Sequence, residues 1–182
     1  MTRAASPRLA DAALPAADHV LGDPQASFML LEYGDYECSA CLQAEPLVRH
    51  LVDSSGGNLC LVFRHFPLVE EHPHAMLAAE AAEAAAAQGR FWPMHHLLFA
   101  HHHRLDLAAL TGHAVALGLD MVRFKSDMAE HIYTQRVHEH RRAGEHAGLR
   151  ATPSFFLDGK PVDVSFGLGK LEEAVLAALD GR

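Results

Sequence analysis

The chain has 182 residues and a formal net charge of −8 with histidine counted as neutral, which fits one domain of somewhat above average size. Its lysines and arginines are scattered, with no basic run longer than Arg141–Arg142, so the charge excludes nucleic acid as an expected partner. No stretch approaches the roughly eighteen consecutive apolar residues of a membrane helix, so we expect no membrane span.

The first residues, 1–17, show no periodicity and predict a flexible N-terminal tail. Their alanine-rich stretch is interrupted by Pro7, Arg8, Asp11 and Pro15, so it is a poor match to the apolar region of a secretory signal. We therefore expect a cytoplasmic protein, or a periplasmic one if a native signal was removed. A reducing compartment favours a catalytic or redox role for closely spaced cysteines over a structural disulfide.

The next segment, Phe28–Tyr33, is a short apolar run that contains Glu32 and is followed by the turn residues Gly34 and Asp35. This pattern predicts a buried strand that ends in a loop. A helix follows at the C-x-x-C pair and ends before Gly56–Gly57, because apolar residues recur at helical spacing: Leu42, Leu47, Val48, Leu51 and Val52.

The pair Cys38 and Cys41 lies at the start of this predicted helix. The unpaired N–H groups and the positive dipole end of a first helical turn stabilise a thiolate, so we expect the pKa of Cys38 to fall well below about 8.5. Cys38 would then be the attacking or attacked sulfur, and Cys41 the resolving sulfur. Two intervening residues also allow a disulfide to close without unwinding the helix.

The C-x-x-C pair is also compatible with half of a zinc site, with a structural disulfide or with a chance spacing. A structural zinc site takes four ligands, commonly from a second C-x-x-C or a histidine pair, and the third cysteine, Cys60, stands alone. Cys60 lies in the apolar run 59–63, which predicts a buried parallel strand, and we interpret it as an inert core thiol.

The segment from His72 to about Gly148 predicts a block of four helices, which cover residues 74–88, 91–103, 107–117 and 120–147. Residues 151–162 then form a strand, an Asp-Gly turn and a second strand, and residues 169–179 form a last helix. This order predicts an α/β sheet with an all-helical insertion. The expected domains are residues 18–71 with 149–182, and the insertion 72–148.

Two motifs together, L-E-Y-G-D-Y-E-C-S-A-C and A-T-P-S-F-F-L-D-G, resemble the DsbA-like thiol–disulfide oxidoreductases of the thioredoxin superfamily. The resemblance covers about residues 18–180 and implies a thioredoxin fold with an inserted all-helical domain. It also implies a protein-disulfide oxidoreductase that works without a cofactor on protein or peptide thiols and disulfides, with an unidentified redox partner, as a monomer or dimer.

The same resemblance implies roles for further residues. Thr152–Pro153 would be a cis peptide whose loop lies across the sulfurs and binds an extended substrate segment. Pro46 would correspond to the proline that kinks the active-site helix. Glu32 would be the buried acid that exchanges a proton with Cys41, or else a salt-bridged strand residue. The expected catalytic set is therefore Cys38, Cys41, Glu32 and Pro153, with Thr152 and Pro153 binding substrate and no metal site.

The sequence departs from the strongly oxidising prototype of the family at Ala40, where the prototype has a histidine before its second cysteine. We therefore expect Cys38 to be less acidic, and the disulfide less oxidising, than in the prototype.

Fifteen histidines invite a metal hypothesis, but no two of them are three or four residues apart, the spacing that a chelating pair on a helix needs. We interpret them as a solvated helix face that titrates between about pH 5 and 8. A rival function is a binding module in which both thiolates and a histidine, His65 or His72, hold Cu(I) or Zn(II) for delivery.

Overall fold

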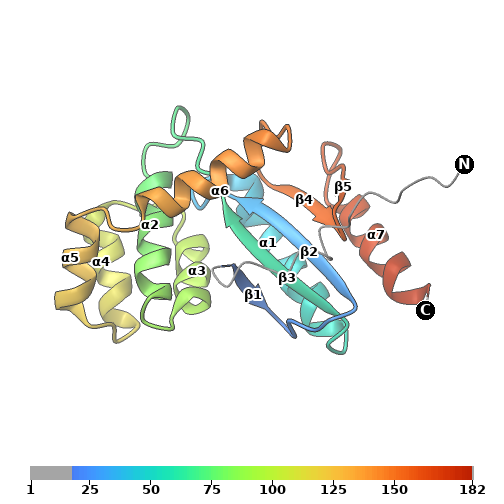
Figure 1. Cartoon of the computed structure of the whole chain (residues 1–182), viewed down its shortest axis with the longest axis horizontal. Coiled ribbons are helices and arrows are strands. Elements are labelled where there is room, and N and C mark those ends of the chain that lie inside the picture. Colours follow the sequence, from blue (N-terminus) through green and yellow to red (C-terminus); the bar gives the residue numbers. More distant parts are fainter. Residues whose placement is uncertain (1–17, 182) are drawn as a thin grey trace, which may run out of the picture. The chain divides into compact units, whose positions relative to one another are not determined.

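The computed structural model of the protein describes residues 18–181 (Figure 1). The predicted tail at residues 1–17 lies outside the described residues, and the cytoplasmic location inferred from it stays a prediction. The elements follow one another as β1 (His19–Leu21), β2 (Phe28–Gly34), α1 (Ser39–Ser54), β3 (Leu59–His65), α2 (Ala75–Ala86), α3 (Phe91–Ala100), α4 (Leu107–Ala116), α5 (Met121–Ala129), α6 (Thr134–His146), β4 (Ser154–Leu157), β5 (Lys160–Val162) and α7 (Gly169–Asp180).

A five-stranded sheet has the order β1-β3-β2-β4-β5. Strand β1 pairs antiparallel with β3, with Val20 opposite Val62, while β2 and β3 run in the same direction (Figure 1). Strands β4 and β5 form the predicted hairpin, because Asp158 and Gly159 both adopt positive φ angles, 47° and 75°, as a two-residue turn of this kind requires. The predicted α/β fold, with its helices inserted between β3 and β4, is therefore confirmed.

The chain divides into two compact units, and the first contains residues 18–32, 47–63 and 154–181. Helix α7 packs against β4 and β5 in this unit, with Leu171 and Val175 fully buried. The side chain of Asp158 also accepts a hydrogen bond from the Met29 N–H at 2.9 Å, which ties the hairpin turn to β2.

The second unit contains Tyr33–Pro46 and Arg64–Pro153. Its central helix is α2, which contacts α3, α4, α5 and α6, and every residue from Ala78 to Ala85 is buried. Alanine suits this position because a small side chain lets neighbouring helices approach closely from several sides. The predicted division into 18–71 with 149–182 and an inserted domain 72–148 stays a prediction.

The prediction of a single last helix over residues 120–147 is wrong. The chain forms α5 and α6 instead, because His131 adopts a left-handed φ of 51°. The His131 N–H then bonds the Met128 carbonyl, and the Ile132 N–H bonds the Asp127 carbonyl, a paired arrangement that closes a helix C-terminus. Glycine usually occupies this position, so the histidine concealed the break. The insertion therefore has five helices rather than four.

No helix in the part of the chain from 18 to 181 has the length and apolar character needed to cross a lipid bilayer.

Candidate active site

The two cysteines of the C-x-x-C pair lie at the start of α1, as predicted. Cys38 directly precedes the helix, and its carbonyl oxygen accepts the first helical hydrogen bond from the Leu42 N–H at 3.1 Å. Cys41 lies one turn later and is fully buried, whereas Cys38 is 7% exposed. The two cysteines are not joined in a disulfide in this structure. Cys38 is therefore the sulfur that a partner molecule reaches more easily.

The pKa of Cys38 is lowered to about 5. Its hydrogen bond with the Cys41 side chain is the main cause, and the contact with Thr152 and the backbone N–H groups of Cys41 and Ala40 add to it against the opposing effect of burial. These N–H groups belong to the first turn of α1, so the helix start acts on the sulfur as expected. Cys38 is ionised at neutral pH.

The loop before β4 contacts Cys38. The Thr152–Pro153 peptide is cis, as the family resemblance implied, and the Cys38 sulfur lies 3.5 Å from the Thr152 carbonyl oxygen, which accepts a hydrogen bond from Cys38 when the thiol is protonated. Thr152 itself is buried. The fold thus brings Thr152 to the cysteine pair, although more than one hundred residues separate them in the sequence.

The three residues before Cys38 each contact a different histidine, an arrangement that sequence reasoning missed. The sequence showed the D-Y-E residues of the motif. It did not show their histidine partners, because no spacing rule links residues so far apart in the chain. We name these contacts the three histidine pairs. They are Asp35–His72 (Oδ2 to Nδ1, 2.8 Å), Tyr36–His95 (hydroxyl to Nδ1, 3.1 Å) and Glu37–His74 (Oε1 to Nδ1, 3.1 Å).

The interpretation of the histidines as a solvated helix face is wrong for at least three of them. His65, His95 and His140 are buried, at 0%, 3% and 9% exposure. Burial, together with the charge of His65, lowers the pKa of His140 to about 3, so His140 is neutral in the folded protein at physiological pH. His65 lies on β3, His95 on α3 and His140 on α6, and the apolar pattern of the sequence did not reveal that these side chains are buried.

The rival metal hypothesis needs a third ligand beside the two sulfurs. Among residues 18–181, no histidine, carboxylate or further cysteine brings a ligand atom within 4.8 Å of both Cys38 and Cys41. The two candidate ligands are engaged elsewhere: His65 lies 2.8 Å from Glu83, and His72 lies 2.8 Å from Asp35. The donor set of a closed three-ligand site is therefore not assembled around the sulfurs.

The remaining predicted residues are Glu32 and Pro46. Glu32 is buried on β2, at 3% exposure, and belongs to the first unit, whereas both cysteines belong to the second. Its proton-exchange role stays a prediction. Pro46 lies inside α1, as the resemblance implied.

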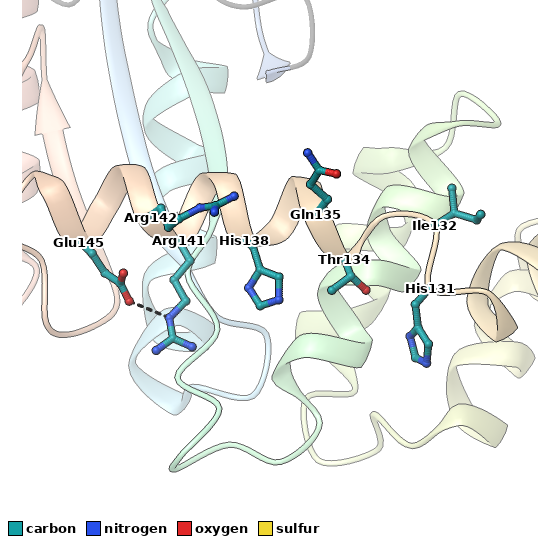
Figure 2. Close-up of a pocket in the computed structure, with 8 residues that line it drawn as sticks. All are labelled: His131, Ile132, Thr134, Gln135, His138, Arg141, Arg142 and Glu145. Atoms are coloured by element: carbon teal, nitrogen blue, oxygen red, sulfur yellow. Dashed lines mark hydrogen bonds and ion pairs between the residues drawn. The ribbon is translucent and has the colours of Figure 1, made fainter.

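A separate hollow of about 760 Å³ follows α6 and the turn before it (Figure 2). Figure 2 shows the Arg141 guanidinium turned toward Glu145, with which it pairs at 3.0 Å. No cysteine lines this hollow, which is bounded by His131, Ile132, Thr134, Gln135, His138, Arg141, Arg142 and Glu145.

Comparison with known proteins agrees with this geometry. The family model described as thioredoxin matches residues 15–176. A thioredoxin-like oxidoreductase from Silicibacter pomeroyi superposes with a TM-score of 0.78 at 28% identity, covering 91% of this chain and 94% of that one. Oxidised BdbD from Bacillus subtilis gives 0.77 at 19% identity, covering 88% and 92%.

Similarity of sequence extends to part of a larger protein. The Na(+)/H(+) antiporter NhaA 1 of Salinispora arenicola is 42% identical over 167 residues, which cover 92% of this chain and 26% of the antiporter. The chain thus spans about a quarter of the length of the curated relatives it matches.

The chain therefore belongs to the thioredoxin family. Its fold is similar to those of BdbD and of α-DsbA1 from Wolbachia pipientis, the second with a TM-score of 0.75 at 20% identity, covering 94% of this chain and 96% of that one.

Proposed function

We propose that the protein is a thiol–disulfide oxidoreductase that exchanges a Cys38–Cys41 disulfide with the thiols of proteins or peptides. One observation carries this proposal: the sulfur of Cys38, whose pKa is lowered to about 5, precedes the first turn of α1, lies 3.5 Å from the Thr152 carbonyl oxygen and has Cys41 one turn behind it. A thiolate stabilised by a helix start is both a reactive nucleophile and a good leaving group.

The exchange begins when a substrate thiolate attacks the Cys38 sulfur of the disulfide form. The Cys38–Cys41 bond breaks, Cys41 leaves as a thiolate that takes up a proton, and a mixed disulfide joins Cys38 to the substrate. A second substrate thiolate then attacks the substrate sulfur, and Cys38 leaves as a thiolate. The substrate loses two electrons and the cysteine pair gains them. Reduction of a substrate disulfide follows the reverse sequence.

Exposure supports Cys38 as the sulfur that is attacked. It keeps 7% of its surface exposed, whereas Cys41 is fully buried and accepts a hydrogen bond from the Asp35 N–H at 3.5 Å. Because the low pKa of Cys38 makes its thiolate the better leaving group, the mixed disulfide is resolved toward release of Cys38.

We assign substrate binding to Thr152 and Pro153. The Thr152 carbonyl already lies 3.5 Å from the Cys38 thiol, so a substrate chain beside this loop would bring its own sulfur to Cys38. Glu32 is proposed as the buried acid that takes up or releases the proton of Cys41. Protein thiols are therefore the proposed partners.

Oxidative refolding of reduced ribonuclease A in a glutathione buffer tests the proposal. We expect the wild-type protein to accelerate disulfide formation and Cys38→Ser to reduce the rate to that of the buffer. Cys41→Ser cannot form the Cys38–Cys41 disulfide, so it should also fall to the rate of the buffer. When this variant is mixed with oxidised ribonuclease A, its Cys38 thiolate should attack a substrate disulfide and form a mixed disulfide that Cys41 can no longer release, visible on a non-reducing gel.

The matched control is Cys60→Ser, which removes the third cysteine. Cys60 is buried in β3 at 2% exposure, and burial raises the pKa of its thiol, so this variant should exchange at the wild-type rate. Full activity of Cys38→Ser, or a mixed disulfide on Cys41 rather than Cys38, would overturn the proposed mechanism.

A further inference from the structure

Asp35 contacts both active-site cysteines through its backbone. Its carbonyl oxygen accepts a hydrogen bond from the Cys38 N–H at 3.2 Å, and its own N–H donates to the Cys41 sulfur at 3.5 Å. A displacement of Asp35 therefore changes the surroundings of both sulfurs.

The side chain of Asp35 is fully buried and holds the active-site turn to a distant loop. One carboxylate oxygen accepts from the Glu37 N–H at 2.8 Å, and the other accepts from the Leu68 N–H at 2.9 Å. The second oxygen also faces His72 Nδ1 at 2.8 Å. A buried carboxylate requires such partners, because an unpaired charge away from water is costly.

His72 faces this carboxylate from the loop before α2, and its side chain is 21% exposed. Partial burial lowers the pKa of His72, but its hydrogen bond to Asp35 and the charges of Asp35, Cys38 and Glu37 outweigh burial and raise it. Glu37 is itself engaged by His74. His72 therefore interacts electrostatically with both the Asp35 carboxylate and the Cys38 thiolate.

We propose that Asp35 and His72 are a positioning pair for the thiol–disulfide exchange: Asp35 holds the turn that orients both sulfurs, and protonated His72 cancels the Asp35 charge that would otherwise destabilise the Cys38 thiolate. This inference rests on the proposed function of the cysteine pair. It gives this chain a histidine that acts on Cys38 from outside the C-x-x-C motif, in which Ala40 offers no charge.

The charges of the pair predict a distinctive result for single and double substitutions. His72→Leu leaves the charge of the Asp35 carboxylate without its counter-charge, so the midpoint of Cys38 ionisation should rise by about 0.5 to 1 pH unit. This shift is at the low end of those caused by a neighbouring charge, because His72 is partly solvated. Asp35→Asn removes the carboxylate as well as the need for its partner. The double variant Asp35→Asn with His72→Leu should therefore return the midpoint close to the wild-type value.

The measurement is the rate of Cys38 alkylation by iodoacetamide against pH, followed by mass spectrometry of the folded protein. It requires no substrate protein, so it can fail or succeed independently of the ribonuclease refolding assay. His72→Gln, which keeps an N–H donor without the charge, is the second single variant and should raise the midpoint in the same direction.

The matched control is His74→Gln, which breaks the neighbouring pair with Glu37. That pair is more exposed, at 44% for the histidine and 21% for the carboxylate, so water screens it and the Cys38 midpoint should stay within about 0.2 unit of wild type. An unchanged midpoint in both His72 variants would overturn the inference. So would an equal rise in His74→Gln, or a double variant that shifts as far as His72→Leu, because each would indicate a loss of local structure instead of charge cancellation.

Discussion

The thiol of Cys38 lies 3.5 Å from the carbonyl oxygen of Thr152, although 114 positions separate the two residues in the chain. The contact links the start of α1 to the loop that leads into β4. It keeps the sulfur at a defined place beside the loop to which we assign substrate binding.

Ionisation of Cys38 predicts thiol reactivity under mildly acidic conditions. With a pKa of about 5, roughly 90% of Cys38 is thiolate at pH 6, whereas an ordinary thiol with a pKa of about 8.5 is ionised to less than about 1%. Iodoacetamide at pH 6 should therefore modify Cys38 rapidly and leave Cys60 intact, as measured by peptide mass spectrometry. An alkylation midpoint near pH 8.5 for Cys38 would contradict the prediction.

A glycine in the last turn of α6 predicts a steric effect. A Cβ atom on Gly144 would lie 2.7 Å from the ring of Phe66 and 3.2 Å from that of Tyr33, so Gly144→Ala should lower the free energy of unfolding by about 1 to 3 kcal/mol. The control is Gly112→Ala in α4, where nothing lies within 4 Å of the added atom. That change should instead stabilise the protein by about 0.5 to 1 kcal/mol, through helix propensity. Urea unfolding of both variants distinguishes packing from propensity.

The buried carboxylate of Glu83 predicts a large stability loss when its charge is removed. Glu83 lies 2.8 Å from His65 and 3.0 Å from the Arg136 Nε, and both Glu83 and His65 have side chains only 1% exposed. Glu83→Gln leaves Arg136 without this counter-charge, so unfolding should become easier by about 3 to 5 kcal/mol in chemical denaturation.

Glu173 provides the comparison for that experiment, because its pair with Lys170 is about 70% exposed on both sides. Glu173→Gln should change stability by less than about 0.5 kcal/mol. Similar losses of stability in Glu83→Gln and Glu173→Gln would show that burial does not make the contacts of Glu83 more stabilising than those of an exposed pair.

The buried His140 predicts loss of stability in acid. As the pH falls below about 6.5, the unfolded chain protonates this histidine, whereas the folded chain keeps it neutral until about pH 3. The stabilisation from neutral His140 is therefore present above pH 6.5 and declines by about 1.4 kcal/mol per pH unit as the pH falls through this window.

The variant that isolates this effect is His140→Gln, which does not titrate but can still accept the hydrogen bond from the His65 N–H. Its free energy of unfolding, measured in urea between pH 7 and pH 4, should fall less steeply than that of the wild type. Parallel curves for the two proteins would assign the acid sensitivity to other groups.

Local patterns were enough to predict most of the fold and the place of the cysteine pair at the start of α1. Apolar periodicity marked β2, α1 and β3, and the Asp158–Gly159 pair marked the hairpin, because both signals depend on neighbouring residues alone. The same locality explains the failure at His131, where a non-glycine residue with positive φ ends α5 without the usual sequence marker.

The position of Cys38 directly before a helix follows from residues within one turn of it, so its ionisation was foreseeable from the chain alone. The pairing of Asp35 with His72, by contrast, joins residues 37 positions apart, and no spacing rule connects them. Burial of His65 and His140 likewise depends on what packs around them. Most of the helices and strands, and the place of Cys38 before α1, could therefore be predicted from the sequence alone, because these depend on neighbouring residues. The electrostatic surroundings of the sulfurs are set only in the folded structure, because these arise from side chains that meet after the chain has folded.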